Sequence, residues 1–413
     1  MAGRRWSVGL TANVVVLGIV SLFTDFSSEM ILPILPFFLT EVLLANALIV
    51  GLIEGLAESA VSFMKVVSGR WSDTAGGRKG FVAAGYGLST MMKVLFPFAV
   101  GWPEFLGMRV VERTGKGVRD APRDALLAES TSPETRGKAF GFHRSMDTAG
   151  AIIGPVAALV LLAALLPPGV VGGPEAGPAY RLIILVAAVP AVVSFACVFL
   201  LREPARQRQP GRPLRITLRG VPRPLVRFIA IASVFSLADF SYAFLLLRAA
   251  DVGESRTIAI LLYVLFNVVY AAHAFPAGIL SDRIGRKPVI LGGYGAFVAM
   301  AVLLAVLPVP VPGVPAGPVV LGALALGFGL YGLSYGMAEG TQRALVADLA
   351  PPEAKATVLG AYHTSVGVVK LASGIVAGLL WVAVAPAATF WFGAIAASVA
   401  AAMLLGWRAP IRS

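Results

Sequence analysis

The sequence is poor in cysteine, histidine and charge. Cys197 is its only cysteine, so no disulfide can form within the chain and a metal site built from several cysteines is excluded. Three histidines in 413 residues argue against a site for a soft metal ion. Charged residues make up only 14% of the chain, whereas 57% is hydrophobic, a balance outside the range of soluble domains. The composition therefore indicates a membrane protein.

Apolar runs of about 20 residues, each long enough to cross a bilayer, recur along the whole chain. We predict twelve membrane-spanning helices with cores at 11–39, 46–68, 80–100, 104–128, 138–166, 180–201, 225–249, 257–279, 288–308, 318–341, 355–384 and 388–407. The first run contains Asp25 and Glu29 and lacks a small-residue cleavage site. It is therefore predicted to be a retained span rather than a secretory signal.

The formal net charge of +12 is concentrated in alternate gaps between these spans. The central segment 202–227 is rich in arginine, whereas the gaps 100–104, 309–318 and 384–388 contain no lysine or arginine. By the positive-inside rule, both termini and the central segment are predicted to be cytoplasmic. No aromatic residue interleaves the first part of 202–227, so we expect no nucleic-acid partner.

Three phrases occur twice in the same order, offset by about half the chain, which predicts an internal duplication. The pairs are Gly69-Arg-Trp-Ser-Asp73 before Gly77-Arg78-Lys79 with Gly278-Ile-Leu-Ser-Asp282 before Gly285-Arg286-Lys287; Ser21-Leu-Phe-Thr-Asp25-Phe-Ser27 with Ser236-Leu-Ala-Asp239-Phe-Ser241; and Ala125-Leu-Leu-Ala-Glu129 with Ala344-Leu-Val-Ala-Asp348. The predicted domains are an N-terminal six-helix bundle (1–201), a cytoplasmic basic linker (202–224) and a C-terminal six-helix bundle (225–413).

The first pair resembles the most specific signature of the major facilitator superfamily, Gly-x-x-x-Asp-(Arg/Lys)-x-Gly-(Arg/Lys)-(Arg/Lys). The copy from Gly278 fits it fully, whereas the first copy has Thr74 at a basic position and one extra residue before Gly77. The resemblance covers essentially the whole chain. It implies an all-α polytopic membrane protein of the major facilitator fold, with two pseudo-symmetric six-helix bundles around a water-accessible cavity and secondary transport by alternating access.

Two further motifs are similar to those of the same family. Arg109 with Gly115 and Gly117 looks like its Arg-Gly-x-Gly motif, although Arg113 occupies an expected glycine position. Gly150-x-x-x-Gly154-Pro155 is similar to the motif associated with proton-linked exporters, without its trailing glycine pair. The glycines and the proline of these motifs are predicted to allow close helix packing and a kink: Gly115, Gly117, Gly150, Gly154 and Pro155.

A closer resemblance is to a bacterial subgroup whose members carry phrases like Asp25-Phe-Ser-Ser-Glu29-Met30 and Gly115-Lys-Gly-Val-Arg119-Asp-Ala-Pro-Arg123. Some of these relatives are assigned as exporters of nickel or similar ions. The metal exporters often end in histidine-rich tails, whereas this chain ends Gly406-Trp-Arg-Ala-Pro-Ile-Arg-Ser413. That departure weakens the metal interpretation.

Charged residues within the spans are expected to face the protein interior, because a charge at mid-membrane costs about 2.5–3.5 kcal/mol. The candidates for substrate binding or proton coupling are Asp25, Glu29, Glu54, Glu58, Arg109, Glu112, Arg113, His143, Asp147, Asp239 and Glu339. Most lie in the first half, so charge coupling is expected mainly there.

Each candidate has an alternative structural role. Asp25 and Glu29 could brace a helix kinked near Pro33 and Pro36, and the glutamates of the second span could carry protons or pair with the arginines of the fourth. Those arginines are expected to hold buried carboxylates rather than to touch substrate. His143 could relay protons with Asp147 or lie solvated at the cytoplasmic mouth.

The duplicated phrase also predicts a cytoplasmic gate. A carboxylate that faces the exposed amides at the start of another helix, and nearby guanidinium groups, would latch it. Its predicted residues are Asp73, Arg78, Lys79, Asp282, Arg283, Arg286 and Lys287.

Taken together, the sequence predicts a proton-coupled antiporter that exports a small cationic or neutral molecule. The proton gradient would drive it, with no bound cofactor, as a monomer in the cytoplasmic (inner) membrane. The alternative is a divalent metal-ion exporter with ligands among Asp25, Glu29, His143 and Asp147. An enzyme is not expected, because neither a His-Glu-x-x-His motif nor a nucleophile elbow is present.

Overall fold

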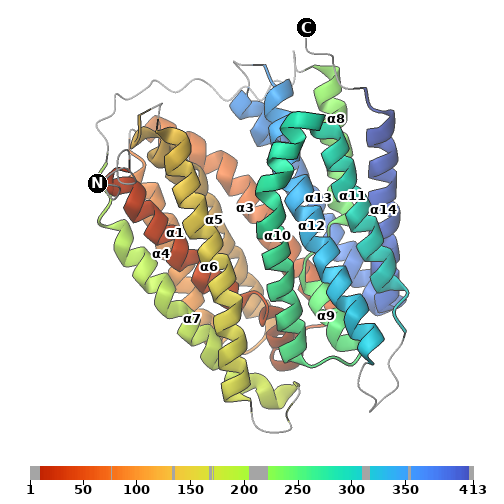
Figure 1. The fold of residues 1–413 in the computed structure, drawn as a ribbon. Coiled ribbons are helices and arrows are strands. Elements are labelled where there is room, and N and C mark those ends of the chain that lie inside the picture. The colour runs from red at the N-terminus through yellow and green to blue at the C-terminus, as the bar shows by residue number, and fades with distance from the viewer. Residues whose placement is uncertain are drawn as a thin grey trace, which may run out of the picture. The chain divides into compact units, whose positions relative to one another are not determined.

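The chain forms a bundle of long helices, shown in Figure 1 as a computed structural model. The structure describes residues 10–75, 77–132, 135–166, 170, 172–203, 222–308, 317–351 and 355–408, except for the side chains of residues 74 and 355–357. Over these ranges no strand occurs. Most of the predicted linker 202–224 and both predicted cytoplasmic termini lie outside the described residues.

The elements of the first half are α1 (Ala12–Ile31), α2 (Leu35–Phe37), the π-helix η1 (Phe38–Val42), α3 (Ala47–Ala75), α4 (Lys79–Leu95), η2 (Phe96–Phe98), α5 (Trp102–Glu129), α6 (Arg136–Leu165), η3 (Pro174–Ala176) and α7 (Gly177–Val198). Those of the second half are α8 (Arg223–Ala238), α9 (Ala243–Asp251), α10 (Arg256–Ile284), α11 (Arg286–Ala305), α12 (Pro318–Leu349), α13 (Lys355–Ala383) and α14 (Pro386–Gly406).

Eleven of the described helical segments are long and apolar enough to cross a membrane. The remaining predicted span, 104–128, is the 28-residue helix α5. This helix carries too many charged side chains to count as an apolar segment. The predicted all-α polytopic fold is confirmed.

Two predicted spans are interrupted. The span predicted at 11–39 ends its first helix at Ile31, because Pro33 has no backbone N–H for a helical hydrogen bond; α2 and the π-helix η1 follow. The span predicted at 225–249 is broken between Ala238 and Ala243, where Ser241 Oγ accepts a 3.3 Å hydrogen bond from the Ala243 amide. A side chain that bonds its neighbouring backbone competes with the helix at this point.

The chain divides into two compact units. The first unit contains residues 1–34, 60–168 and 175–213, and the second contains 35–59, 169–174 and 214–413. This grouping by contacts differs from the division into sequence halves, since two segments of the first half belong to the second unit. The predicted domain boundaries at 201 and 225 stay a prediction.

In the first unit, helices distant in sequence lie side by side. Helix α1 packs against α6 and α7, and α4 packs against α5 (Figure 1). Glycine lets α4 and α5 approach, since a Cβ built at Gly85 would lie 2.6 Å from the carbonyl oxygen of Gly115. Buried apolar side chains, including Val14, Leu17 and Tyr86, fill the space between these helices.

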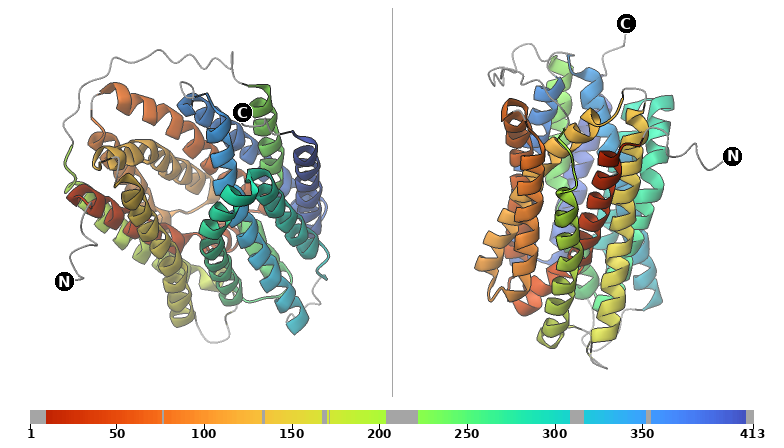
Figure 2. Two further views of the ribbon diagram at one scale, coloured as in Figure 1. Left: turned by 45° about the horizontal axis from the view of Figure 1, so that its top comes forward. Right: turned by 90° about the vertical axis from the view of Figure 1, so that its left-hand side faces the viewer.

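In the second unit, α12 packs against α10 and α11, and α14 packs against α11 and α8 (Figure 2). The first half of α3 belongs to this unit and lies on α13: a Cβ at Gly55 would approach Leu371 Cα to 3.0 Å, and Ser59 Oγ donates a 2.7 Å hydrogen bond to the Gly367 carbonyl. Helices α10 and α11 are joined at Gly285, whose φ of 94° favours glycine.

Candidate functional site

Helices α1 and α6 approach at backbone distance where the exporter-like glycine motif lies. A Cβ built at Gly150 would lie 2.9 Å from the Phe26 amide, and one at Gly154 would lie 2.8 Å from the Phe26 carbonyl oxygen. Neither position therefore has room for a side chain. The absence of side chains brings the turn of α1 that contains Asp25 and Glu29 directly onto α6.

The carboxyl groups of Asp25 on α1 and Asp147 on α6 are hydrogen-bonded to each other. Asp147 also accepts a 2.9 Å hydrogen bond from Ser21 Oγ and forms a 2.6 Å ion pair with Arg144. A hydrogen bond between two carboxyl groups requires a proton on one of them, because ionised carboxylates only accept.

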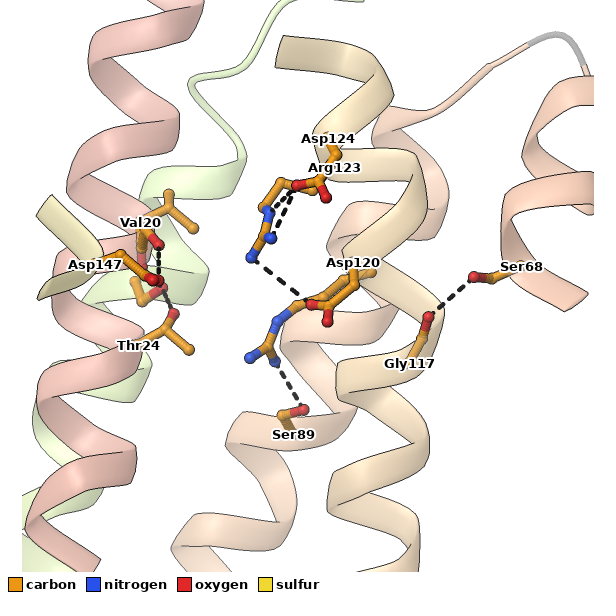
Figure 3. A network of polar contacts seen from close by, with 12 residues as sticks. Val20, Thr24, Ser68, Ser89, Gly117, Asp120, Arg123, Asp124 and Asp147 are labelled. Atoms are coloured by element: carbon orange, nitrogen blue, oxygen red, sulfur yellow. Dashed lines mark hydrogen bonds and ion pairs between the residues drawn. The ribbon is translucent and has the colours of Figure 1, made fainter. Parts of the chain in front are cut away.

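The same face of α1 is joined to α7 by hydroxyl groups. Thr24 Oγ1 lies 2.5 Å from Ser194 Oγ, and Ser194 Oγ donates a 2.8 Å hydrogen bond to the Val20 carbonyl (Figure 3). These contacts hold α1 against a second helix within one turn of Asp25. The carboxyl pair thus lies on a firmly positioned segment.

The charged stripe of α5 pairs largely within itself. Arg109 and Arg113 approach Glu112 Oε2 at 3.1 and 3.5 Å, and all three side chains are buried. Further along the helix, Arg123 contacts Asp120 at 3.6 Å and Asp124 at 2.8 Å (Figure 3). The geometry agrees with arginines that hold buried carboxylates, the role expected for them.

A buried lysine, Lys93 on α4, faces the same turn of α1. Its ammonium donates hydrogen bonds of 3.1 and 2.8 Å to Ser27 and Ser28, and the residue is only 2% exposed. Asp25 and Glu112 both attract this charge. Lys93 lies in the third predicted span, and the sequence indicates no role for it. The residue spacing within that span does not show that α4 contacts α1.

His143 lies on α6, one turn before Asp147. It is 6% exposed, so the alternative of a solvated residue at the cytoplasmic mouth is wrong. Among the described residues its Nε2 has no hydrogen-bond partner. The imidazole therefore lies buried near Asp147.

The glutamates of the second span belong to the second unit. Glu54 is buried, and Glu58 attracts the ammonium of Lys370 on α13. Lys370 also forms a 3.0 Å ion pair with Asp239, which lies at the break between α8 and α9. A second buried charge cluster thus exists where the sequence predicted only sparse charge.

Glu339, the remaining candidate, lies on α12. It accepts a 3.0 Å hydrogen bond from the Tyr270 hydroxyl and forms an ion pair with Arg343 one turn away. Tyr270 was not singled out in the sequence.

The two copies of the gate phrase form equivalent clusters, one in each unit. In the first, Arg78 contacts Asp73 at 3.0 Å and bonds Glu129 through both Nε and NH2, at 3.1 and 2.9 Å. Glu203 accepts the amides of Arg78 and Lys79 at the start of α4, at 2.8 and 2.7 Å. Asp73 thus contacts the guanidinium group, whereas Glu203 binds the helix start that Asp73 was expected to face.

In the second cluster, Arg286 contacts Asp282 at 2.6 Å and Asp348 at 3.2 Å. Arg283 lies exposed beside it. Glu129 and Asp348, which complete the two clusters, are the final residues of the third duplicated phrase. The sequence therefore contained the signal for both, although neither was predicted as a gate residue.

A lysine in each copy also binds the end of the last helix of its half. Lys79 Nζ donates to the carbonyls of Phe199 and Leu201 after α7, at 2.9 and 2.6 Å. Lys287 Nζ donates to those of Leu405 and Trp407 at the end of α14, at 2.9 and 2.8 Å. Both satisfy carbonyl groups that a helix end leaves without partners.

A metal site has no geometric support within the described part of the chain. There, no three His, Cys, Asp or Glu side chains lie close enough together to hold a metal ion. In particular, Asp25, Glu29, His143 and Asp147 do not form such a group.

These features define a multi-pass membrane protein of the transporter class, with buried charge in its spans and a repeated cluster at two helix junctions. The family model of the Major Facilitator Superfamily matches residues 17–250 and 228–413. An uncharacterized MFS-type transporter of Methanocaldococcus jannaschii is 36% identical over 402 residues, 96% of this chain and 95% of that protein. The chain belongs to the major facilitator superfamily and is a secondary transporter.

Other similar proteins extend the comparison. An uncharacterized protein of Mycobacterium tuberculosis is 27% identical over 346 residues, covering 82% of this chain and 79% of its own. Among solved structures, a nucleoside transporter carrying a D323A substitution has a TM-score of 0.77 at 14% identity, covering 96% of this chain and 100% of that one. A D-xylose–proton symporter has a TM-score of 0.72 at 14% identity, covering 96% and 98%. These likenesses concern the fold.

Proposed function

We propose that this transporter is a proton-coupled antiporter that exports a small cationic or neutral molecule from the cytoplasm. The observation that carries the proposal is the hydrogen-bonded pair Asp25–Asp147 between α1 and α6. Two carboxyl groups that share a hydrogen bond hold one proton readily, whereas two full negative charges repel each other. The pair therefore binds or releases a single proton as a unit.

Release of that proton would change the contact between α1 and α6. Helix α1 contacts α6 closely at Gly150 and Gly154. Repulsion between the two carboxylates would therefore act directly on the packing of these helices. Arg144 and Lys93 lie close enough to compensate the second charge. In alternating access, protonation from outside and deprotonation toward the cytoplasm would bias the two bundles toward opposite faces.

Sequence features support the proposed direction of transport and the proposed membrane. The Gly150-x-x-x-Gly154-Pro155 motif favours export, and the basic gaps favour an inner membrane with both termini in the cytoplasm. The acidic residues of the first two spans favour a cationic or neutral substrate.

Purified protein in proteoliposomes tests the coupling. A thermal-shift screen of organic cations and neutral compounds first selects a ligand, whose flux is then measured with and without an imposed pH gradient. We expect flux that follows the gradient in the wild type and in Asp124→Asn, a matched ion-paired carboxylate of the same unit. Flux that is independent of the gradient in the wild type would falsify proton coupling.

A further inference from the structure

The break in the span Arg223–Asp251 lies in the second unit and begins at Asp239. Non-helical backbone within a membrane is tolerated where it is buried in protein or lines a water-filled space. In transporters, interrupted helices contribute to substrate sites. Neither proline nor glycine occurs at residues 239–242, so the break is not explained by a helix-breaking residue.

The carboxylate of Asp239 is held at this break by two other helices. The Tyr335 hydroxyl on α12 lies 3.1 Å from both carboxylate oxygens, and Lys370 Nζ on α13 lies 3.0 Å from Oδ2. The Asp239 side chain is 9% exposed and that of Lys370 is 25% exposed. Asp239 is therefore buried, whereas Lys370 is partly exposed.

The ammonium of this ion pair has a second carboxylate near it. Both Asp239 and Glu58 attract the single ammonium of Lys370. Glu58 lies on the part of α3 that belongs to the same unit. Two carboxylates around one cation favour a second cation over an anion.

Aromatic rings surround the same point. The ring centroid of Tyr335 lies 5.9 Å from that of Phe266 and 6.2 Å from that of Tyr270, in edge-on arrangements. The ammonium of Lys370 lies 6.0 Å from the centroid of the Tyr335 ring, within the range of a cation–π contact. Tyr335 and Tyr270 are partly exposed, so their rings can contact a ligand.

A buried hydroxyl without a partner lies beside the cluster. Tyr294 is completely buried, and among the described residues its hydroxyl makes no hydrogen bond. Its ring stacks on Phe235, one turn before Asp239, at 3.8 Å between centroids. The charge of Asp239 acts on this hydroxyl. An unsatisfied buried hydroxyl is destabilising in proteins.

We propose that the Asp239 cluster, formed by Asp239, Lys370, Tyr335, Tyr270, Phe266 and Glu58, binds the transported substrate, an organic cation with a flat aromatic ring system. The substrate's positive charge displaces the Lys370 ammonium from Asp239, and its ring lies against the Tyr335 and Tyr270 rings. Lys370 thus occupies the cation position while the site is empty. This inference rests on the proposed transport of a cation and adds its chemistry and its location.

Ethidium, a planar fluorescent cation, is the probe for this site. Its binding to the purified full-length protein is measured by fluorescence anisotropy in detergent, without any pH gradient. We expect Asp239→Asn to weaken binding by about tenfold, and Tyr335→Leu to weaken it by a similar factor, whereas Tyr335→Phe keeps the ring and stays within about threefold. Asp251→Asn, which removes an ion-paired carboxylate from α9 outside the cluster, is the matched control and should bind as the wild type does.

The Lys370→Gln variant tests whether the Lys370 ammonium competes with a bound cation. Removal of the competing ammonium should tighten ethidium binding by about threefold or more, whereas unchanged or weaker ethidium binding would contradict competition between Lys370 and the bound cation. If Asp239→Asn does not yield folded, monodisperse protein, Tyr335→Leu and Lys370→Gln carry the test. The proposal is overturned if the wild type does not bind ethidium at millimolar concentration. It is also overturned if it binds the planar anion fluorescein in preference, or if the folded variants among Asp239→Asn, Tyr335→Leu and Lys370→Gln all bind like the wild type.

Failure of this site and failure of proton coupling give different results. Asp25→Asn should lose gradient-driven flux, whereas Asp239→Asn should lose ethidium binding itself. If flux proves independent of the gradient while binding still requires Asp239, the coupling fails and the site stands. If flux follows the gradient while Asp239→Asn and Tyr335→Leu bind normally, the site fails and the coupling stands.

Discussion

Arg256, the first residue of α10, donates a 2.6 Å hydrogen bond to Glu41 in the π-helix η1, across 215 residues of sequence. The other oxygen of Glu41 accepts the Gly173 amide at 2.7 Å. The guanidinium carbon of Arg256 also lies 5.0 Å from the centroid of the Phe37 ring. One carboxylate thus ties three separate segments of the second unit together.

We expect Glu41→Gln to lower the midpoint of thermal unfolding, because Arg256 would keep a largely buried charge without a counter-ion. Removing one partner of such a pair costs about 3 kcal/mol, or a shift on the order of 5 °C. Unfolding of the purified protein in detergent measures the effect, with Glu175→Gln, an exposed acid on η3, as the control. A charge-swapped double variant, Glu41→Arg with Arg256→Glu, should recover part of the loss. If it is no more stable than either single variant, the ion pair does not stabilise the unit.

The carboxyl pair makes a prediction about the mode of transport. Asp25→Asn replaces the proton-sharing group with an amide that can still donate a hydrogen bond to Asp147, so it mimics the protonated pair. We expect this variant to lose transport against a concentration gradient while it retains exchange of substrate for substrate across the membrane. Parallel measurements of gradient-driven flux and exchange in proteoliposomes separate the two modes. A variant that still accumulates substrate in response to a pH gradient would remove Asp25 from the coupling mechanism.

The glycines of α6 offer a packing test with its own control. A methyl group at Gly150 or Gly154 would collide with the backbone of α1, so Gly150→Ala and Gly154→Ala should each destabilise the protein by about 1–3 kcal/mol. Gly141 lies on the same helix, and no atom lies within 4 Å of the point where its Cβ would be. Gly141→Ala should therefore be neutral or stabilising by up to about 1 kcal/mol. Equal stability of the three variants in thermal unfolding would contradict the close contact of α1 and α6.

The two gate clusters should respond differently to lysine. Arg78 bonds Glu129 with two nitrogens and Asp73 as well, and a lysine cannot reproduce this fork. Arg286 uses separate nitrogens for Asp348 and Asp282 and makes no two-nitrogen contact with a single carboxylate, so Arg286→Lys should be the milder change. We expect Arg78→Lys to reduce stability and transport rate several-fold more than Arg286→Lys, as measured by thermal unfolding and initial flux. A larger effect of Arg286→Lys would mean that the second cluster is the more constrained one.

The sequence predicted eleven of the spans because each is a long apolar segment. The duplicated phrases predicted the related clusters at Arg78 and Arg286 because both copies keep the residues that pair. The interruption at Asp239 was not predictable from breaker residues, since the chain there reads Asp-Phe-Ser-Tyr. Its counterpart at Asp25-Phe-Ser-Ser remains helical within α1, so the same residues adopt different backbones in different surroundings.

Contacts between segments that are distant in the sequence also could not be predicted from it. Lys93 meets Ser27 and Ser28 only because α4 and α1 lie together, and the apolar pattern of a span does not specify its neighbours. Likewise, nothing in the composition of α3 indicates that its first half, with Glu58, belongs with α13. Such pairings depend on three-dimensional packing, which cannot be deduced from the spacing of charges along one helix.

The lysines at the start of α4 and α11 have a consequence for biosynthesis. Lys79 and Lys287 each leave the ribosome long before the helix end that they bind, at residues 199–201 and 405–407. Until that helix is synthesised, the lysine ammonium has no carbonyl group of this kind to bind. Each half can therefore complete this hydrogen bonding only when its last helix is in place.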